Sequence, residues 1–415
     1  MIAKDLLRQV IYEQREMHEN LGVERQIDNS LVSVPEILVI SGVRRCGKSI
    51  LLQQIKARQP EQDYYINFDD DRLIHFTVDD FQVLCDVFAE DFGMQHIFYL
   101  DEIQMISGWE HFVNRLYRQH CKVFVTGSNA FLLSRELGTL LTGRHLRQTL
   151  FPLSLSEYAA LKNIKYQKAD FYTTEGRAKL LNLQNEYLRK GGFPQYVASD
   201  NPRYLKELYN DIIFRDLVVR HGLPADKPIR EVTYYLASNN THLYTHTSVA
   251  KATGIKSTDT ISSYISFLEE TYLVGVLTKY DHKVGEQLKS PRKIYFIDNG
   301  LVSQIGFSFS QNTGAKLENA VYLELRRREK DIYYFNNGAE CDFIVHEDNH
   351  IAAAYQVTVS ISDQSTAKRE IDGVVAAMNA FDLDEGYVIT LDESAEQTLP
   401  DGRQIHILPY YRWTL

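Results

Sequence analysis

Residues 42–49 read Gly-Val-Arg-Arg-Cys-Gly-Lys-Ser, and this stretch decides the fold of the chain. Its glycine, four variable residues, glycine, lysine and serine stand in the order of a phosphate-binding loop. The stretch follows the apolar run Glu-Ile-Leu-Val-Ile-Ser at 36–41 and opens a helical pattern at 49–58. Backbone N–H groups of such a turn converge on phosphate, and the helix N-terminus adds a favourable dipole. The sequence therefore predicts a nucleotide site between a strand and a helix.

The residues of this loop are expected to hold ATP and Mg²⁺. Lys48 neutralises the β- and γ-phosphates, and the Ser49 hydroxyl binds the metal ion. Arg44 and Arg45 are expected to face either phosphate or a neighbouring subunit, and Cys46 is interpreted as a small filler. The predicted cofactor-binding residues of the loop are Gly42, Val43, Arg44, Arg45, Cys46, Gly47, Lys48, Ser49 and Ile50.

A second motif supports the first. The apolar run Ile-Phe-Tyr-Leu at 97–100 ends in Asp101 and Glu102. Asp101 is expected to support Mg²⁺, and Glu102 to orient the attacking water as a general base. A carboxylate pair after a strand is weak evidence alone, but it becomes strong after a phosphate-binding loop. Because Glu102 is present, we predict hydrolysis of ATP rather than binding alone.

A third polar position follows the apolar run Lys-Val-Phe-Val-Thr at 122–126. Ser128 is the first candidate for a residue that contacts the γ-phosphate, and Asn129 is the second. The alternative is ordinary turn chemistry, since both residue types favour turns.

The spacing of strands and helices predicts an α/β fold with a doubly wound parallel sheet. Runs rich in β-branched and aromatic residues stand at 36–41, 63–68, 97–100 and 122–126, as buried parallel strands require. Helical patterns lie between them, including 109–119. Breaks near 150, 223 and 300 predict four domains: an ATPase core at 1–150, a helical lid at 151–222, a winged helix at 223–300 and an α/β domain at 301–415.

The composition limits the classes of partner. Forty-five Lys and Arg against 55 Asp and Glu give a net charge of −10, which argues against coating nucleic acid through bulk charge. Four scattered cysteines form neither a disulfide framework nor a metal cluster, which favours a reducing compartment. No run reaches the ~20 apolar residues of a membrane span. We expect a cytoplasmic protein with no membrane partner.

A helix at 248–253, a glycine-containing turn and a second helix from 257 or 258 predict a helix-turn-helix, and strands at 274–280 and 293–297 would form a wing. Polar residues of the second helix are candidates for contact with a DNA backbone: Lys256, Ser257, Thr258, Thr260 and Ser263. Lys283, Lys289, Arg292 and Lys293 add positive charge to the wing, but acidic residues share the span. DNA is therefore one candidate partner, and a protein partner or a joint between subunits is the other.

The order of elements in residues 301–415 resembles that of restriction-endonuclease-like nucleases. Glu318 on a helix and Asp342 on a strand match that pattern. Gln356 stands where a metal-binding glutamate is expected, and Thr358 stands where a catalytic lysine is expected. Loss of such a cation typically costs about 10²–10³ in rate, and nothing in the sequence places Lys368 as a substitute. We expect a nuclease-like fold without nuclease activity.

The chain as a whole resembles a known group, the prokaryotic AAA-type ATPases that carry a C-terminal domain of unknown function. The segments that carry the resemblance span residues 36–301 and include Ser-Gly-Val-Arg-Arg-Cys-Gly-Lys-Ser, Tyr-Leu-Asp-Glu-Ile-Gln and Lys-Gly-Gly-Phe-Pro. The resemblance implies that Arg144 is an arginine finger, acting in cis or across a subunit boundary. It also implies that Gly192 and Pro194 belong to a lid element near the nucleotide base. A homo-oligomer follows if Arg144 acts in trans.

The predicted function is Mg²⁺-dependent ATP binding and hydrolysis that drives a conformational change on DNA or on a protein–DNA complex. One alternative is a slow ATP-gated switch with a protein partner. Another is an ATP-coupled nuclease.

Overall fold

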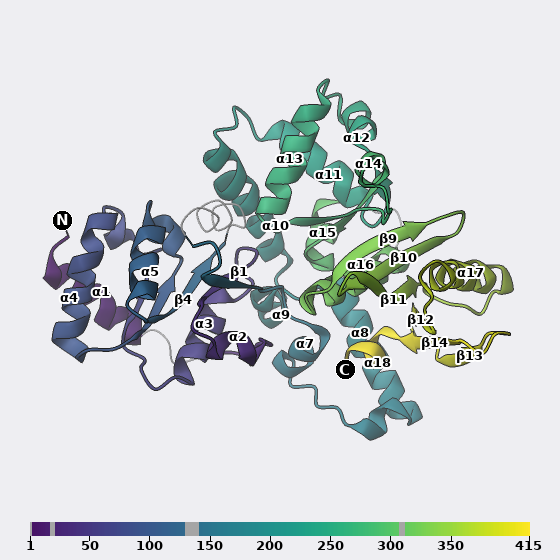
Figure 1. Ribbon diagram of the computed structural model, residues 1–415, viewed down its shortest axis with the longest axis horizontal. Helices are drawn as coiled ribbons and strands as arrows, with labels where there is room; N and C mark the ends of the chain where they lie inside the picture. The colour runs from purple at the N-terminus through teal and green to yellow at the C-terminus, as the bar shows by residue number, and fades with distance from the viewer. Residues whose placement is uncertain (1, 17–20, 129–140, 307–311) are drawn as a thin grey trace. The chain divides into compact units, whose positions relative to one another are not determined.

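The computed structural model describes residues 2–16, 21–128, 141–306 and 312–415 (Figure 1). Contacts within the chain divide it into two compact units. The first unit comprises residues 1–150 and 270–272, and the second comprises residues 151–269 and 273–415. The finer division at 222 and 300 stays a prediction.

The first unit is built on a five-stranded parallel sheet, which confirms the predicted α/β class. Its strand order is β2 (Tyr65–Asn67), β3 (Ile97–Asp101), β4 (Lys122–Gly127), β1 (Ile37–Ser41) and β5 (His145–Thr149). Four of these strands were expected from their apolar runs. The edge strand β5 was not, because its sequence His-Leu-Arg-Gln-Thr carries no apolar run and only Gln148 is buried.

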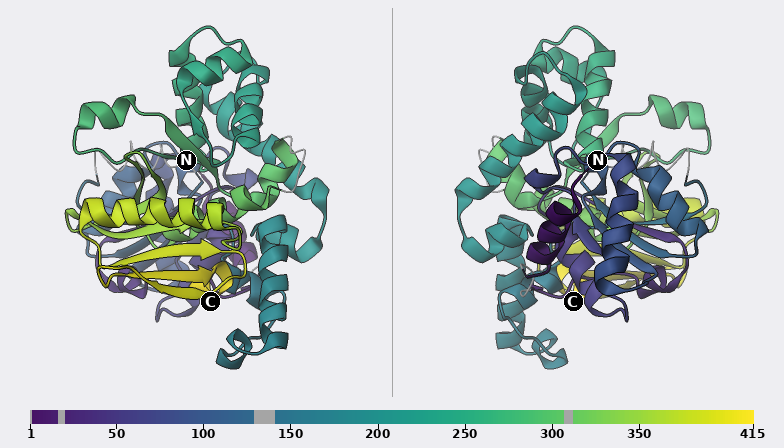
Figure 2. Two further views of the ribbon diagram at one scale, coloured as in Figure 1. Left: turned by 90° about the vertical axis from the view of Figure 1, so that its right-hand side faces the viewer. Right: turned by 90° about the vertical axis from the view of Figure 1, so that its left-hand side faces the viewer.

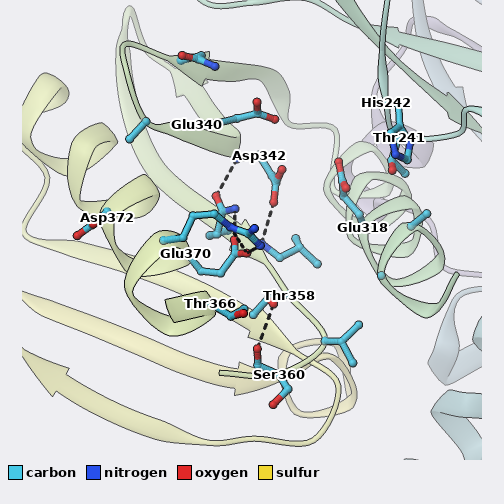
Figure 3. Close-up of a pocket in the computed structure, with 18 of the residues that line it drawn as sticks. Thr241, His242, Glu318, Glu340, Asp342, Thr358, Ser360, Thr366, Glu370 and Asp372 are labelled. Carbon is cyan, nitrogen blue, oxygen red and sulfur yellow. Dashed lines mark hydrogen bonds and ion pairs between the residues drawn. The ribbon is translucent and has the colours of Figure 1, made fainter. Parts of the chain in front are cut away.

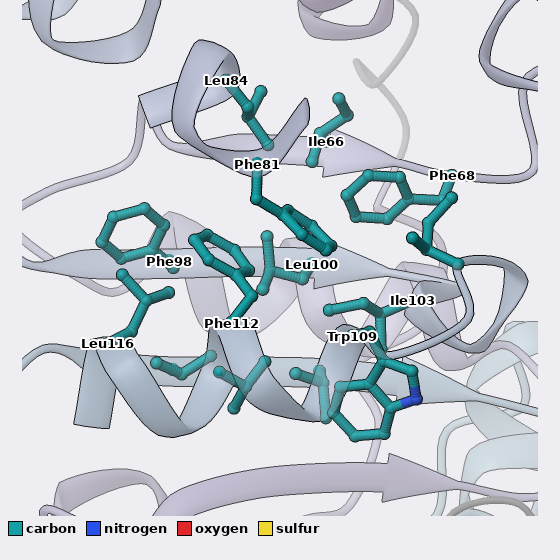
Figure 4. Close-up of a cluster of buried hydrophobic side chains, with 14 of the residues drawn as sticks. Ile66, Phe68, Phe81, Leu84, Phe98, Leu100, Ile103, Trp109, Phe112 and Leu116 are labelled. Carbon is teal, nitrogen blue, oxygen red and sulfur yellow. The ribbon is translucent and has the colours of Figure 1, made fainter. Parts of the chain in front are cut away.

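Helices cover both faces of this sheet. α1 (Lys4–Glu16), α4 (Phe81–Phe92) and α5 (Trp109–Arg118) pack on one face, where alternate strand residues meet aromatic side chains (Figure 4). The rings of Phe81 and Phe112 stack with centroids 4.0 Å apart. α3 (Lys48–Ala57) packs on the other face, where it contacts β1, β3 and β4. Its Lys56 lies over the ring of Tyr65, whereas the neighbours of Tyr65 along the chain, Tyr64 and Ile66, face the aromatic core. Burial on both faces explains the continuous apolar runs.

The second unit begins with helices and a small sheet. The helices are α7 (Leu155–Leu161), α8 (Thr174–Lys190), α9 (Pro194–Ser199), α10 (Pro202–Asp211) with a π-helical continuation at Ile212–Val219, and α11 (Lys227–Ser238). Then follow β6 (Leu243–Tyr244), α12 (His246–Thr253), α13 (Thr258–Glu270), β7 (Val274–Leu277), α14 (Val284–Lys289), β8 (Arg292–Phe296) and α15 (Asn299–Ile305). The antiparallel sheet has the order β6-β8-β7.

The chain ends in a six-stranded mixed sheet. After α16 (Thr313–Arg327) come β9 (Asp331–Asn336), β10 (Glu340–Glu347), β11 (His350–Val357), α17 (Gln364–Phe381), β12 (Glu385–Thr390), β13 (Ala395–Thr398), β14 (Gln404–Pro409) and α18 (Tyr410–Thr414). The order is β13-β14-β12-β11-β10-β9, with β11 antiparallel to β10 and parallel to β12. α17 lies along this sheet (Figure 2, left) and packs on β10, β11 and β12.

Backbone pairing joins the small and the large sheet of the second unit. Tyr280 N donates to Tyr334 O over 2.8 Å, and Tyr334 N donates to Thr278 O over 3.1 Å. The Tyr334 hydroxyl donates to the carbonyl of Pro291. The segment between β7 and β8 is therefore anchored to β9 rather than projecting alone.

Candidate functional site

The predicted phosphate-binding loop lies at the carboxyl end of β1 and leads directly into α3. Gly42 is required because a Cβ there would lie 2.2 Å from the carbonyl oxygen of Leu150. Gly47 has φ +104°, a conformation that side chains disfavour, and it forms the N-cap of α3. The loop therefore takes the path that the motif predicts, with its backbone turning into a helix N-terminus.

The Lys48 side chain is buried, with 4% of its surface exposed. Its ammonium donates to the carbonyl oxygens of Gly42 and Val43 over 3.3 and 3.2 Å. The nearest carboxylate oxygen among its ion pairs is Glu102 Oε1, at 3.8 Å. The partners of this cation are therefore mainly neutral oxygens of the loop itself.

Asp101 ends β3 and is fully buried. Its Oδ2 accepts hydrogen bonds from the Tyr65 hydroxyl and from Asn67 Nδ2, both over 3.2 Å, and its Oδ1 accepts one from the Thr126 hydroxyl. Burial raises the pKa of Asp101 to about 6, with a further contribution from the Glu102 charge, against the lowering effect of these hydrogen bonds.

The Ser49 hydroxyl also hydrogen-bonds to Asp101, and this bond lowers the pKa of the carboxyl. The loop serine and the strand-end carboxylate thus meet at one point, although 52 positions separate them in the sequence. A hydroxyl beside a carboxylate is the oxygen pair that holds Mg²⁺ in phosphate-binding loops. The residues present fit a magnesium ion.

Glu102 follows β3 in a left-handed conformation, with φ 50°. Its backbone N–H donates to the Thr126 hydroxyl over 2.8 Å, which holds the turn in place. Its side chain accepts a hydrogen bond from Gln104. A non-glycine residue with positive φ costs of order 1–3 kcal/mol and is often found at functional sites.

Ser128 lies at the same edge of the sheet as the loop. The register pairs Ser41 with Gly127, so the residue after β4 stands beside the start of the loop. Ser128 is 8% exposed. Its contact with a γ-phosphate stays a prediction, and Asn129 lies outside the described residues.

Arg144 lies at the amino end of the strands, whereas the loop lies at their carboxyl end. Its carbonyl accepts from Ile37 N over 2.9 Å, at the amino end of β1, whereas the loop starts at the carboxyl end. At about 3.3 Å per residue, the length of β1 puts about 13 Å between these levels. The Arg144 guanidinium donates to Asn114 on α5. This placement disfavours action on the loop of the same chain, and action in trans stays a prediction.

Two residues of this site carry no sequence motif. Arg25, which is 4% exposed, donates from Nη1 to the carbonyl of Cys46 over 2.6 Å and so stabilises the loop. Thr126 joins Asp101 to the backbone of Glu102. The one sequence signal for the role of Thr126 is its position at the end of the apolar run 122–126, which forms the strand beside that of Asp101. Cys46 is fully buried, and burial raises the pKa of its thiol, so it is a filler.

Gly192 and Pro194 lie in the second unit, and the structure gives their motif a local explanation. Gly192 N donates to Asp298 Oδ2 over 2.6 Å, and a Cβ on Gly191 would lie 2.1 Å from the same oxygen. Pro194 opens α9 in its first turn, where a missing N–H costs nothing. Burial raises the pKa of Asp298 to about 7. A role of Gly192 or Pro194 near a nucleotide base stays a prediction.

Glu318 and Asp342 line one pocket of the second unit, a cavity of about 1420 Å³ between β8, α16 and the large sheet (Figure 3). Asp342 Oδ2 accepts from Val357 N over 3.0 Å, and Glu318 Oε1 accepts from the Tyr295 hydroxyl over 2.7 Å. Burial and the Asp342 charge raise the pKa of Glu318 to about 7. Both carboxylates line the same pocket, and their role as a nuclease-like site stays a prediction.

Gln356 and Thr358 also line this pocket, but their side chains are used within the protein. Gln356 Oε1 accepts from Asp342 N over 3.1 Å, and its Nε2 donates to Glu370 over 2.6 Å. The Thr358 hydroxyl donates to the carbonyl of Ser360 over 3.2 Å. Neither side chain is arranged as a free ligand.

Lys293 is a buried cation of this pocket, and here the expectation from the sequence was wrong. We placed Lys293 on a basic wing facing DNA, but it is 4% exposed and its ammonium contacts Glu318, Glu340 and Asp342. In β8 only Arg292 is half-buried, and Lys293 and the residues after it are all buried, so the Lys293 ammonium lies among the carboxylates. Lys368 also lines the pocket.

Comparisons with known proteins match two regions of this chain to families and nearly the whole chain to two relatives. A family described as an AAA domain matches residues 34–159, and a domain of unknown function matches residues 181–312. An uncharacterized protein of Methanocaldococcus jannaschii is 33% identical over all of this chain and 96% of its own length. An uncharacterized protein of Haemophilus influenzae is 30% identical over 91% of this chain and 94% of its own length.

Solved structures match more distantly. AMPPCP-bound DnaA from Aquifex aeolicus covers 58% of this chain and 84% of its own, with 16% identity and a TM-score of 0.21. Cdc6p from Pyrobaculum aerophilum covers 73% of this chain and 98% of its own, with 12% identity and a TM-score of 0.24. TM-scores this low carry no argument about this chain. Across the described ranges, no helix is both long and apolar enough to cross a bilayer.

Proposed function

The chain belongs to the family of the Methanocaldococcus jannaschii and Haemophilus influenzae proteins and has a P-loop AAA-type core, and from this premise we propose that it binds ATP with Mg²⁺ and hydrolyses it. One observation carries the proposal: the Ser49 hydroxyl bonds to the carboxylate of Asp101, and the buried ammonium of Lys48 lies 3.8 Å from the carboxylate of the next residue, Glu102. The two motifs therefore form a single site.

Each residue of this site has a chemical role in the proposal. Lys48 exchanges its loop carbonyl partners for phosphate oxygens. Ser49 and Asp101 hold Mg²⁺, which when bound neutralises phosphate charge. Glu102 orients the attacking water and accepts its proton, and Ser128 contacts the γ-phosphate. Arg144 of one copy reaches the site of another copy, which makes the active form a homo-oligomer.

The first experiment is ATP turnover by the full chain with Mg²⁺, with Glu102→Gln as the comparison. We expect Glu102→Gln to bind a fluorescent ATP analogue as tightly as the wild type and to lose about 10²–10³-fold in kcat. Turnover of the variant at the wild-type rate would exclude Glu102 as the base. An absence of turnover in the wild type, with nucleotide bound, would favour a slow switch.

The role of Arg144 is tested by the dependence of turnover on protein concentration. Action in trans predicts that the rate per chain rises with concentration and that Arg144→Ala removes most of this rise. Mixing Arg144→Ala with Lys48→Ala should then restore part of the turnover, because each variant supplies the residue that the other lacks. No restoration, with both variants folded, would contradict action in trans.

DNA is the second candidate partner, proposed on the order α11-β6-α12-α13-β7-α14-β8, which resembles that of a winged helix with the short helix α14 between its last two strands. Lys251, Lys256, Ser257 and Ser263 are exposed around α13, although the burial of Lys293 reduces the charge available on the wing. Phosphate contact makes DNA affinity fall with salt. We expect Lys256→Glu to weaken binding of a labelled duplex and to lower its salt dependence, whereas Lys206→Glu, at an exposed site on α10, does not. Indifference of binding to Lys256→Glu would favour a protein partner.

A further inference from the structure

A buried ammonium group stands at the centre of the pocket in the second unit. Lys293 Nζ lies 2.8 Å from Glu340 Oε1, 2.8 Å from Asp342 Oδ1 and 3.2 Å from Glu318 Oε1. The three carboxylates come from α16 and β10, and the lysine comes from β8. Four charged side chains from three elements thus meet at one point.

The arrangement of the three oxygens is that of ligands around a cation, but at ammonium distances. Oxygen ligands lie about 2.0–2.1 Å from Mg²⁺ and about 2.3–2.6 Å from Ca²⁺. The observed N···O distances of 2.8, 2.8 and 3.2 Å are longer than these by about 0.2 Å or more. Within the described ranges, no group of three or more His, Cys, Asp or Glu side chains is close enough to hold a metal ion. The centre is already occupied by a positive charge.

Other hydrogen bonds hold Asp342, Glu318 and the strand of Lys293 in place. Asp342 is fixed by Val357 N, and Glu318 by the Tyr295 hydroxyl. The strand that carries Lys293 is fixed to α16, because Phe296 N donates to Asn319 Oδ1 and Asn319 Nδ2 donates to Phe296 O, both over 2.9 Å. These bonds do not involve the ammonium, so they keep Asp342 and Glu318 beside the cavity when the ammonium is removed, and the carboxylates then move inward to reach the distances of metal ligands.

We propose that Lys293 is a tethered cation that takes the place of a divalent metal ion in this pocket. In the wild-type chain the ammonium neutralises part of the charge of Glu318, Glu340 and Asp342 and excludes a metal ion from their centre. Replacement of Lys293 by a neutral residue leaves three carboxylates beside a cavity that admits water and ions. Such oxygen ligands suit Mg²⁺, Ca²⁺ or Mn²⁺.

The neighbouring charges support a stably charged lysine. The carboxylates raise the pKa of Lys293 well above its usual range, against the opposing effect of burial. The inference is independent of ATP hydrolysis, which belongs to the other unit. It supplies a physical reason for the expected lack of metal-dependent nuclease chemistry: the metal position is filled by the protein's own side chain.

The test is Mn²⁺ binding by the full chain, counted from the electron paramagnetic resonance of free Mn²⁺ without nucleotide. All proteins carry Ser49→Ala, which weakens the metal position in the first unit. The variants compared are Lys293→Ala, Lys293→Arg, Asp342→Asn alone, Lys293→Ala with Asp342→Asn, and Lys206→Ala as an exposed-lysine control.

We expect Lys293→Ala to bind one Mn²⁺ per chain at least about tenfold more tightly than the parent, with Asp342→Asn abolishing this site. Lys293→Arg and Lys206→Ala should resemble the parent. If Lys293→Ala is unfolded alone, refolding on addition of Mn²⁺ supports the proposal, and a chain that stays unfolded with Mn²⁺ overturns it. Binding by the parent at a site that Asp342→Asn removes would also overturn it, because metal and lysine would then coexist.

Discussion

Lys48 in the first unit and Lys293 in the second are equally buried, with 4% of each side chain exposed, but their partners differ. The ammonium of Lys48 bonds to two backbone carbonyls and lies 3.8 Å from one carboxylate. The ammonium of Lys293 lies within 3.2 Å of three carboxylates. The charge of Lys48 is only partly compensated within the protein, whereas the charge of Lys293 is compensated by carboxylates of the protein itself.

The difference shows that burial alone does not identify a binding lysine. Neutral carbonyl partners are readily exchanged for the oxygens of an incoming phosphate, which bears more charge. Carboxylate partners are not, because each one left behind in a buried place would carry an uncompensated charge. The partners of a buried cation therefore separate a ligand site from an internal ionic cluster.

The largest expected effect is on the stability of the second unit. Lys293→Ala leaves three carboxylates without their cation, and breaking a buried ion pair in this way typically costs about 3–5 kcal/mol. We expect a loss of this order in the free energy of unfolding, measured with urea in the absence of divalent metal. Lys206→Ala should change it little. A variant as stable as the wild type would mean that the cluster contributes nothing to folding.

The next effect concerns Asp298, a buried carboxyl group, and is a dependence of stability on pH. Asp298 is held by backbone N–H groups, and its pKa is about 7 when folded, above the unfolded value near 3.9. The folded state keeps the proton that the unfolded state loses, so stability falls as pH rises from about 4 to about 7, by about 4 kcal/mol in total. Above that window the loss is constant.

We expect Asp298→Asn to remove most of this fall, as measured by urea unfolding at several pH values. Exposed Asp384→Asn is the control and should keep the wild-type slope. Asp101, up to about pH 6, and Glu318, up to about pH 7, contribute falls of the same sign, so a residual slope is expected in this variant. A variant with the full wild-type slope would show that Asp298 does not titrate in this range.

Lys48→Ala tests the lysine with neutral partners, which is expected to matter for catalysis more than for stability. It should lower kcat for ATP by about 10²–10³-fold, the usual loss for one group that stabilises developing charge. Its cost in the free energy of unfolding should be smaller than that of Lys293→Ala, since the neutral partners of Lys48 remain satisfied more easily. Equal destabilisation by the two substitutions would remove the distinction between them.

The smallest effect is expected at Thr126, a positioning residue. Thr126→Val keeps the shape but removes the bonds to Asp101 and to Glu102 N, each worth about 0.5–1.5 kcal/mol. We expect kcat to fall about tenfold at nearly constant KM for ATP. Thr126→Ser should recover most of the rate. A change in KM alone would place the effect on nucleotide binding instead.

Much of the first site was predictable because its motifs are contiguous. The loop at 42–49 and the pair Asp101-Glu102 each follow a buried strand, and parallel strands bring their carboxyl ends to one edge. Strand β5 was missed because an edge strand with one buried residue has no apolar run. Arg25 and Thr126 were missed because their roles depend on partners 21 and 25 positions away.

The second site was predicted in part. The resemblance to restriction-endonuclease-like nucleases singled out Glu318 and Asp342. Lys293 was assigned to a basic wing, because the sequence shows its charge and not its side of the strand. A neighbouring residue, Arg292, has the same charge and is half-buried on the opposite face of β8. A shift of one position in a strand changes the face on which a side chain lies.

By itself, the sequence determined the parallel α/β core and the residues of its phosphate-binding loop, because strand periodicity and the loop motif are local properties of the backbone. Only the tertiary structure decided that Lys48 remains available to a ligand while Lys293 does not. The charge around a buried group depends on which side chains distant in sequence pack against it, and packing is settled only when the elements come together.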